Sequence, residues 1–273
     1  MVTKGGDAID SLSRRNERTR RIHREVIPLL HRWLTVCGGI AVLCLTAACG
    51  GAAAGPSHAK SSGSGAASAC VPGAAAHGVI LPAAQEPNAG VDQPAGACWA
   101  KIAATPIANV TFGTPPSGSS AAVRVAWSTK ALYVLCSVHA WPLYAAAPAS
   151  AWWQNDACEY YVSGSNSHSG AYGAHDGQIG LIYSGGLHAG PNSKVAVSAL
   201  KGLTKVTPKE GYSTLLIVPW SALGVGKPAK GQSYQFDAAI DYGDASGKYV
   251  AQVTWTGSGL FSSTQQWGAI ALH

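Results

Sequence analysis

The sequence predicts an all-β protein, an antiparallel β-sandwich with a jelly-roll-like arrangement in a single domain. Apolar residues alternate with a period of two over much of the second half of the chain, and no helical stretch of any length competes with that pattern. Clusters of Gly, Pro, Asn or Ser separate most of the alternating segments. Many short strands with turn residues between them are typical of sandwiches and jelly rolls, for which about 200 residues suffice.

Two strands are expected close together, at residues 121–127 and 131–140. In AAVRVAW, valine and tryptophan alternate with alanine and arginine, and ALYVLCSVHA places Leu, Val, Cys and Val on one face. The short gap between them is typical of a hairpin. Further strands are expected at 157–162, 178–184, 194–199, 212–218, 234–240, 249–255 and 267–272, and a helical turn at 219–224.

Residues 1–48 are predicted to be an export signal of the lipoprotein type. Seven arginines between 14 and 32 precede the apolar run 33–48, which is short for a membrane span of about 20 residues. The run ends in LTAAC, which resembles a bacterial lipoprotein box and makes Cys49 the residue for lipid modification. That resemblance implies a lipid anchor in the membrane at the cell surface. The alternative is ordinary secretion with cleavage near Ala48.

Residues 49–69 are predicted to be a flexible linker, because they consist largely of Gly, Ala and Ser. The folded domain is expected over 70–273, beginning with an irregular lead-in to about residue 115. Residues 49–273 carry eleven Lys/Arg and nine Asp/Glu, and Arg124 is the only arginine among them. Because phosphate binding needs clustered positive charge, we expect no binding to nucleic acid.

Four cysteines remain for the folded domain, and an even number in an exported protein predicts two disulfides. Strand parity places Cys136 and Cys158 on the apolar faces of their strands. If these strands are neighbours, Cys136–Cys158 is a cross-sheet bridge and Cys70–Cys98 holds the lead-in. Zinc is the rival, but the sequence contains no C-x-x-C pair among the four.

Several motifs occur in order along the second half of the chain. They are LYVLCSV (132–138), WWQNDACEYYV (152–162) with its W-x-x-D-x-x-E spacing, GYSTLLIVPWSALG (211–224), KGQSYQFDAAIDYGDASGK (230–248) and WGAIAL (267–272). In this order they resemble the family 9 carbohydrate-binding modules and their relatives in the wider DOMON-like β-sandwich group. The resemblance covers about residues 98–273.

The resemblance implies a β-sandwich that binds sugar without catalysis and often accompanies glycoside hydrolases. Trp153 and Glu159 match the aromatic residue and the acid of the W-x-x-D-x-x-E segment, to which Asp156 also belongs. Trp255 or Trp267 would supply a second ring, and the sequence does not decide between them. The chain departs from the family pattern where Leu215 or Leu216 replaces a glutamate before the I-P-W motif, and where Cys158 precedes the acid.

The chemistry of a sugar supports the same residues independently. A pyranose presents an apolar face that stacks on aromatic rings and hydroxyls that bind to carboxylates and amides. Adjacent Trp152 and Trp153 point opposite ways in an extended chain, so one of them can be core and the other exposed. The alternative for Asp156 and Glu159 is the acid and base of a glycosidase. Asp156 is also expected to cap the loop before its strand.

Other ligands and roles stay open. The loop DYGDASGK offers Asp241, Asp244 and Ser246 as oxygen ligands for a structural Ca²⁺, although such residues also favour turns. Some DOMON-like relatives hold haem, for which His139, His168, His175 and His188 are candidates. A structural or adhesion domain without a ligand site is the third alternative. No G-x-S-x-G, P-loop or G-x-G-x-x-G motif indicates an enzyme.

Overall fold

The structure, a computed structural model, describes residues 80–85 and 91–273. The predicted signal segment 1–48, the linker 49–69, the lipidation residue Cys49 and Cys70 lie outside the described residues and stay predictions. Within the described part of the chain, no helix has the length and apolar character needed to cross a membrane.

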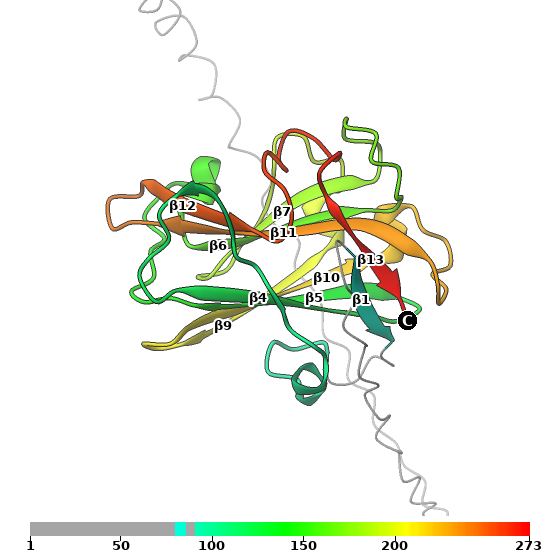
Figure 1. The fold of residues 1–273 in the computed structure, drawn as a ribbon, viewed down its shortest axis with the longest axis horizontal. Helices are drawn as coiled ribbons and strands as arrows, with labels where there is room; N and C mark the ends of the chain where they lie inside the picture. Colours follow the sequence, from blue (N-terminus) through cyan, green and yellow to red (C-terminus); the bar gives the residue numbers. More distant parts are fainter. Residues whose placement is uncertain (1–79, 86–90) are drawn as a thin grey trace, which may run out of the picture. The chain divides into compact units, whose positions relative to one another are not determined.

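The strands of the described residues form two sheets that enclose a common core (Figure 1). Sheet A consists, in spatial order, of β8 (Leu187–Ala189), β7 (Asp176–Ile182), β6 (Ala157–Ser163), β11 (Ser233–Gly243) and β13 (Gly268–Leu272). Along its second half β11 pairs instead with β12 (Tyr249–Thr254), which pairs in turn with β3 (Asn109–Gly113). Sheet B consists of β4 (Ser120–Trp127), β5 (Ala131–His139), β10 (Gly211–Pro219) and β9 (Lys201–Thr207), with β2 (Thr105–Pro106) beside β4.

The predicted antiparallel β-sandwich is confirmed, with one strand that departs from it. β1 (Ile80–Gln85) pairs in parallel with β13 of sheet A and with β4 of sheet B, so it links the two sheets. The sequence does not reveal this strand, because Pro82 interrupts its pattern and proline is confined to edges and ends of strands.

Most of the expected strands occur within a few residues of their predicted limits. The strand expected at 194–199 is wrong, since that segment is loop and the 3-10 turn η3 (Val197–Ala199). The strand follows it as β9, at the edge of sheet B, where several side chains are exposed and the apolar alternation is weak. The helical turn expected at 219–224 is the 3-10 helix η4 (Trp220–Leu223).

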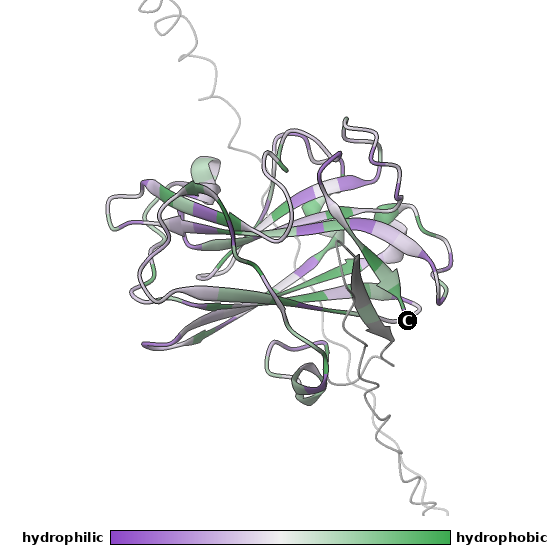
Figure 2. Ribbon diagram, in the orientation of Figure 1, coloured by the Kyte–Doolittle hydropathy of each residue, from purple (hydrophilic) through white to green (hydrophobic). Residues whose placement is uncertain are grey.

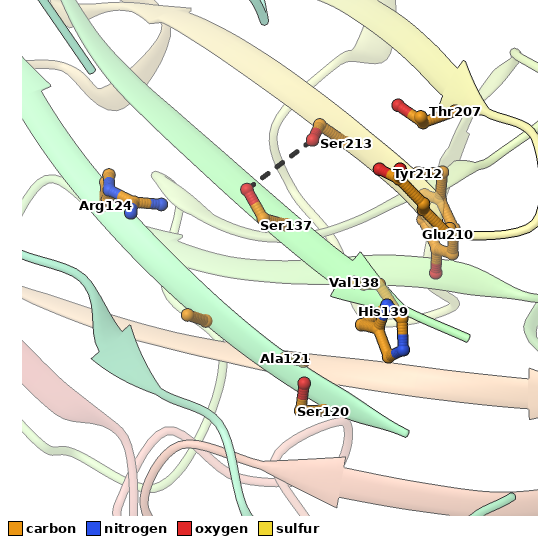
Figure 3. Close-up of a pocket in the computed structure, with 12 residues that line it drawn as sticks. Ser120, Ala121, Arg124, Ser137, Val138, His139, Thr207, Glu210, Tyr212 and Ser213 are labelled. Atoms are coloured by element: carbon orange, nitrogen blue, oxygen red, sulfur yellow. Dashed lines mark hydrogen bonds between the residues drawn. The ribbon is translucent and has the colours of Figure 1, made fainter. Parts of the chain in front are cut away.

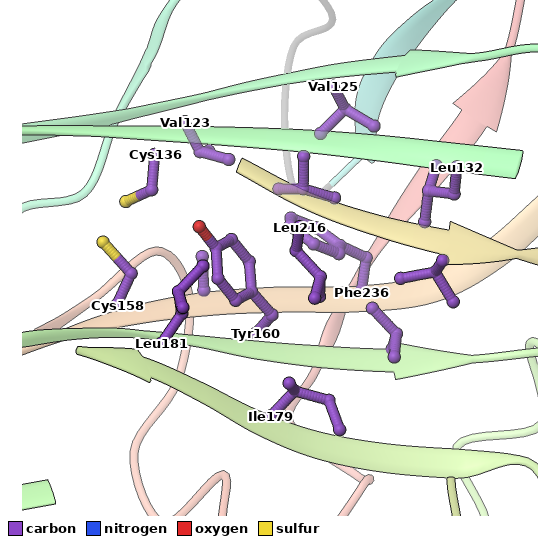
Figure 4. Packing of buried hydrophobic residues seen from close by; sticks show 14 of the residues in the cluster. Val123, Val125, Leu132, Cys136, Cys158, Tyr160, Ile179, Leu181, Leu216 and Phe236 are labelled. Carbon is purple, nitrogen blue, oxygen red and sulfur yellow. The ribbon is translucent and has the colours of Figure 1, made fainter. Parts of the chain in front are cut away.

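The core lies between the inner faces of the two sheets and follows from the period-two alternation of the strands. Hydrophobic and hydrophilic residues alternate along several strands in Figure 2, and the inward residues of both sheets interdigitate in Figure 4. Trp127 and Trp220 are buried here, as their strand and I-P-W contexts predict. Each indole satisfies its N–H, with donation from Trp220 Nε1 to Ser128 O over 2.8 Å.

The predicted Cys136–Cys158 disulfide is wrong, because both cysteines are free thiols. Strand parity places both side chains in the core, as expected, and their sulfurs point toward each other from β5 and β6 (Figure 4). These strands belong to opposing sheets and are not neighbours within one sheet, which the prediction required. Burial, followed by the contact with Cys158, raises the pKa of the Cys136 thiol well above its usual value. Cys98 is disulfide-bonded, and its predicted pairing with Cys70 stays a prediction.

Candidate functional site

A row of polar side chains crosses the outer face of sheet A. It consists of Gln178 on β7, Glu159 on β6, Asp241 on β11 and Gln252 on β12. Glu159 lies opposite Gly180 and Ala239, so Gln178 and Asp241 are its diagonal neighbours, at a spacing that long side chains bridge. Asp241 lies directly opposite Gln252. Alternation along the strands therefore gathers two carboxyls and two amides on one face.

Glu159 is held in this row by two neutral donors. Tyr161 Oη and Gln178 Nε2 both donate to Glu159 Oε2, the latter over 2.9 Å. Both donors therefore contact the same oxygen of the carboxylate. Gln178 is itself buried, and its Oε1 has no hydrogen-bond partner.

Asp241 lies behind Glu159 and is fully buried. Its Oδ1 accepts hydrogen bonds from Tyr249 Oη over 3.1 Å and Gln252 Nε2 over 3.0 Å, whereas its Oδ2 receives none. Burial and the neighbouring charge of Glu159 raise the pKa of Asp241 well above its usual value. Two carboxyls that are neighbours on one face disfavour each other's charged form.

A pocket of about 520 Å³ lies over this row, within the range typical of small-molecule sites. Its polar lining comes from Glu159, Gln178 and Gln252 of the polar row, together with Thr111 and Ser258. Its aromatic lining comes from four different segments of the chain: Phe112, Trp153, Tyr249 and Phe261. No Lys, Arg or His is among its lining residues, all of which lie in the described part of the chain.

Trp153 reaches the pocket because its neighbour anchors the turn that carries it. Both tryptophans lie in the 3-10 segment η2 (Ala149–Gln154), where Trp152 is buried and Trp153 is 37% exposed. The Trp152 ring occupies the space that the absent side chain of Gly180 leaves, since a Cβ there would lie 2.1 Å from the ring. The two indoles meet edge to face at 5.9 Å. One core and one exposed tryptophan were expected, but a 3-10 turn separates them rather than an extended chain.

Two phenylalanines and a tyrosine complete the aromatic lining. Phe112 stacks on Tyr249 with parallel rings 4.8 Å apart, and it lies opposite Gln252 in the pairing of β3 with β12. Phe261 lies on the loop between β12 and β13 and is 53% exposed. Sequence reasoning missed all three, because β3 was not recognised and only tryptophans were considered as partners of Trp153.

Neither Trp255 nor Trp267 lines the pocket, which corrects the expectation that one of them supplies the second ring. Trp267 is buried, and its Nε1 donates to Leu260 O over 3.0 Å, next to Phe261. Trp255 packs against Phe236 at 6.0 Å. Trp267 therefore supports the loop that carries an exposed ring and is not itself the ring.

Asp156 does not line the pocket either, so its expected contact with sugar is corrected. The carboxylate is buried and accepts hydrogen bonds from Tyr144 N over 2.5 Å and Gly243 N over 3.1 Å. Burial raises its pKa to about 6, against the opposing effect of these two hydrogen bonds. The structural role expected for Asp156, holding the loop before its strand, is the one that it has.

The three residues expected to bind calcium do not form a cation site. Asp244 Oδ1 accepts hydrogen bonds from Ser246 N, Ser246 Oγ and Lys248 N at 2.7–3.0 Å, so the turn is closed by its own donors. Asp241 instead belongs to the polar row under the pocket. Among the described residues, no group of three His, Cys, Asp or Glu side chains could hold a metal ion.

The candidate haem-binding histidines lie apart on different segments. His139 ends β5, His168 bonds to Gln235 Nε2 at 2.8 Å, and His188 stacks on Trp152 at 6.0 Å. His175 lies beside Gly224. This dispersion gives no support to the haem-binding alternative.

A second hollow, of about 360 Å³, lies over β4, β5 and β10 of sheet B (Figure 3). It is lined mainly by small or polar side chains, including Ser137 and Ser213, whose hydroxyls are 3.5 Å apart. Arg124 at its edge donates from Nε to Ile102 O. The hollow has no Trp or Phe in its lining, and its one tyrosine, Tyr212, is buried, so it lacks the exposed indole of the other pocket.

Residues 91–273, more than half of the chain, match the family described as carbohydrate family 9 binding domain-like. The chain belongs to this family. Endo-1,4-β-xylanase A of Thermoanaerobacterium saccharolyticum is 27% identical over 150 residues, which are 55% of this chain and 12% of the xylanase. The chain therefore spans a small part of this relative's length.

Two solved structures of a family 9 carbohydrate-binding module from Caldicellulosiruptor kristjanssonii share the fold. The complex with glucose has a TM-score of 0.57 at 19% identity and covers 65% of this chain and 87% of that module. The complex with cellotriose has a TM-score of 0.51 at 19% identity, with 60% and 82% covered. Family membership supports carbohydrate binding by the family 9 domain, and these neighbours share its fold.

Proposed function

We propose that the family 9 domain binds carbohydrate without catalysis, in the pocket over sheet A. One face of a pyranose stacks on Trp153, while its hydroxyls donate to Glu159 Oε1 and Gln178 Oε1. The observation that carries this proposal is the half-exposed indole beside a buried carboxylate in a pocket of about 520 Å³. An aromatic face and fixed polar acceptors are what the two surfaces of a sugar ring require.

The arrangement of the carboxyls argues against glycoside hydrolysis. Hydrolysis requires two carboxyl groups roughly 5–9 Å apart that flank the scissile bond. Asp156 is bonded to the backbone outside the pocket, and Asp241 lies behind Glu159 on the same face of the same sheet. Glu159 is therefore the one carboxylate that lines the pocket.

The ligand class that we propose is a β-1,4-linked glycan or one of its terminal units. Support comes from the Caldicellulosiruptor module, which has been solved with glucose and cellotriose, and from the relative named a xylanase. Because the pocket volume is that of a small-molecule site, we propose that it takes a short segment of the chain.

Calorimetric titration with glucose, cellotriose and xylotriose tests this proposal. Trp153→Ala should weaken binding by at least about tenfold, because it removes the stacking face. Trp141→Ala is the matched control, since Trp141 is 49% exposed and does not line the pocket. Equal affinity of wild type and Trp153→Ala, with the fold intact, would overturn the proposed site.

We further propose that the protein is exported and held at the membrane by lipid on Cys49. Support comes from the basic and apolar order of residues 1–48 and from the LTAAC sequence. Mass spectrometry of the mature N-terminus tests this, and an unmodified terminus near Ala48 would indicate secretion instead.

A further inference from the structure

The polar groups under the pocket include two carboxyls, and a neutral sugar supplies no positive charge to compensate them. Glu159 and Asp241 place two carboxyls on one patch of sheet A, and no cationic side chain lines the pocket above them. Buried carboxyls without a cationic partner are costly, so such a pair is expected to have an occupant that compensates it.

Among the residues that the structure describes, the two buried side-chain atoms without a hydrogen-bond partner are both acceptors. Asp241 Oδ2 and Gln178 Oε1 have no hydrogen-bond partner, and the side chains that carry them are 0% and 4% exposed. Glu159 accepts hydrogen bonds from Tyr161 Oη and Gln178 Nε2 at the same oxygen, Oε2. The site therefore calls for a ligand group that supplies several hydrogens and positive charge at one point.

We propose that this pocket selects a hexosamine with a free amino group, whose ammonium binds at Glu159 beside Gln178 and above Asp241. This inference rests on the proposed function and specifies the sugar. The ammonium donates to the Glu159 carboxylate, and its positive charge adds to this hydrogen bond a coulombic attraction that a hydroxyl cannot supply.

The walls of the pocket suit the same ligand. Trp153, Phe112, Tyr249 and Phe261 line the pocket, and aromatic faces attract a nearby cation in addition to stacking on a ring. A quaternary ammonium lacks the N–H groups that the unpartnered acceptors require. A uronic acid would bring a third carboxylate to a patch that already holds two. An N-acetylated hexosamine lacks the positive charge of the free amine.

Isothermal titration of the full chain with D-glucosamine, D-glucose and N-acetyl-D-glucosamine tests this inference. At about pH 6.5, an amine with the pKa of an ordinary α-amino group, about 7.7, is mostly protonated. We expect glucosamine to bind about tenfold more tightly than glucose or N-acetylglucosamine, because only its ammonium adds the attraction of opposite charges to the hydrogen bonds that a hydroxyl or an amide also makes with Glu159.

Asp241→Asn provides the decisive variant, because it removes a charge from a positioning residue that does not line the pocket. We expect it to lower the ratio of glucosamine affinity to glucose affinity from about tenfold to near one. Asp244→Asn is the matched control, since it removes a nearby carboxylate that lies outside the pocket, and it should keep the preference.

Each outcome of these titrations either supports or overturns the inference. Equal binding of glucosamine and glucose by the wild type overturns this inference and leaves the proposed function intact, whereas absence of binding by every sugar overturns both. A preference that persists in Asp241→Asn also overturns it. If Asp241→Asn does not fold, the ratio of glucosamine to glucose affinity in the wild type still supports or overturns the inference.

Discussion

At the scale of single residues, the site depends on neighbours that never touch the pocket. Trp152 sets the place of Trp153, and Trp267 holds the Leu260 carbonyl next to Phe261. The sequence motif identifies Trp153 and Glu159 correctly as pocket residues, because the motif lies on one strand and the turn before it. It does not identify Phe261, because the local sequence does not show which of the two aromatic residues, Phe261 or Trp267, is exposed.

The buried thiols give a prediction at this scale. Cys136 and Cys158 are free and enclosed in the core, where a raised pKa keeps the Cys136 thiol protonated. Alkylation followed by mass spectrometry should find both cysteines unmodified in the folded protein and both modified after unfolding without reductant. Recovery of a Cys136–Cys158 cross-linked peptide would contradict the free thiols and restore the disulfide that the sequence predicts.

At the scale of elements, the turn η2 and the strand β7 have complementary shapes where they pack together. The turn η2 packs its buried tryptophan on β7 at Gly180, where any side chain would overlap the indole. The pairing of β6 with β7 and β11 then brings Gln178 and Asp241 to either side of Glu159. The register of β6, β7 and β11 therefore fixes the relative positions of these three side chains.

Gly180→Ala tests this match. The added methyl group displaces Trp152, so we expect a loss of about 1–3 kcal/mol in the free energy of unfolding and weaker sugar binding through Trp153. Gly226→Ala is the control, because a Cβ there would meet nothing within 4 Å. Urea denaturation measures both, and a Gly180→Ala variant as stable as Gly226→Ala would show that the packing is not needed.

The strands that sequence analysis predicts well are those with both neighbours in a sheet. β5 and β10 are easily recognised because both are long and largely apolar, with one face in the main core and the other against a second apolar cluster. β9 and β3 lie at edges with several exposed residues, and β1 contains Pro82, so their alternation is weak. The polar row was only partly predictable, since its members lie on four strands whose pairing the sequence does not reveal.

At the scale of the whole molecule, buried carboxyls make stability depend on pH. Burial raises the pKa of both Asp156 and Asp237 from 3.8 to about 6, against hydrogen bonds that lower it. Asp237 holds both ends of the loop that carries Phe261, through Thr256 N and Gly268 N. A carboxyl whose pKa is raised by folding stabilises the fold when protonated, so this contribution is present below about pH 4 and lost as the pH rises through about 6.

We therefore expect the free energy of unfolding to fall as the pH rises from about 4 to about 7. One pKa unit corresponds to about 1.4 kcal/mol, so each of the two groups accounts for up to about 3 kcal/mol. Denaturation at a series of pH values measures the slope, and Asp156→Asn should reduce it. A stability that instead rises over this interval would show that these carboxyls are not the dominant titrating groups.

The central claim is that the pocket over sheet A binds a sugar ring, and a crystal structure of the protein with D-glucosamine tests it most directly. The account predicts the ring against Trp153, with its nitrogen within hydrogen-bonding distance, about 2.7–2.9 Å, of Glu159 Oε1. Sugar in the hollow of sheet B between Arg124 and Ser213, with the pocket at Trp153 empty, would contradict it.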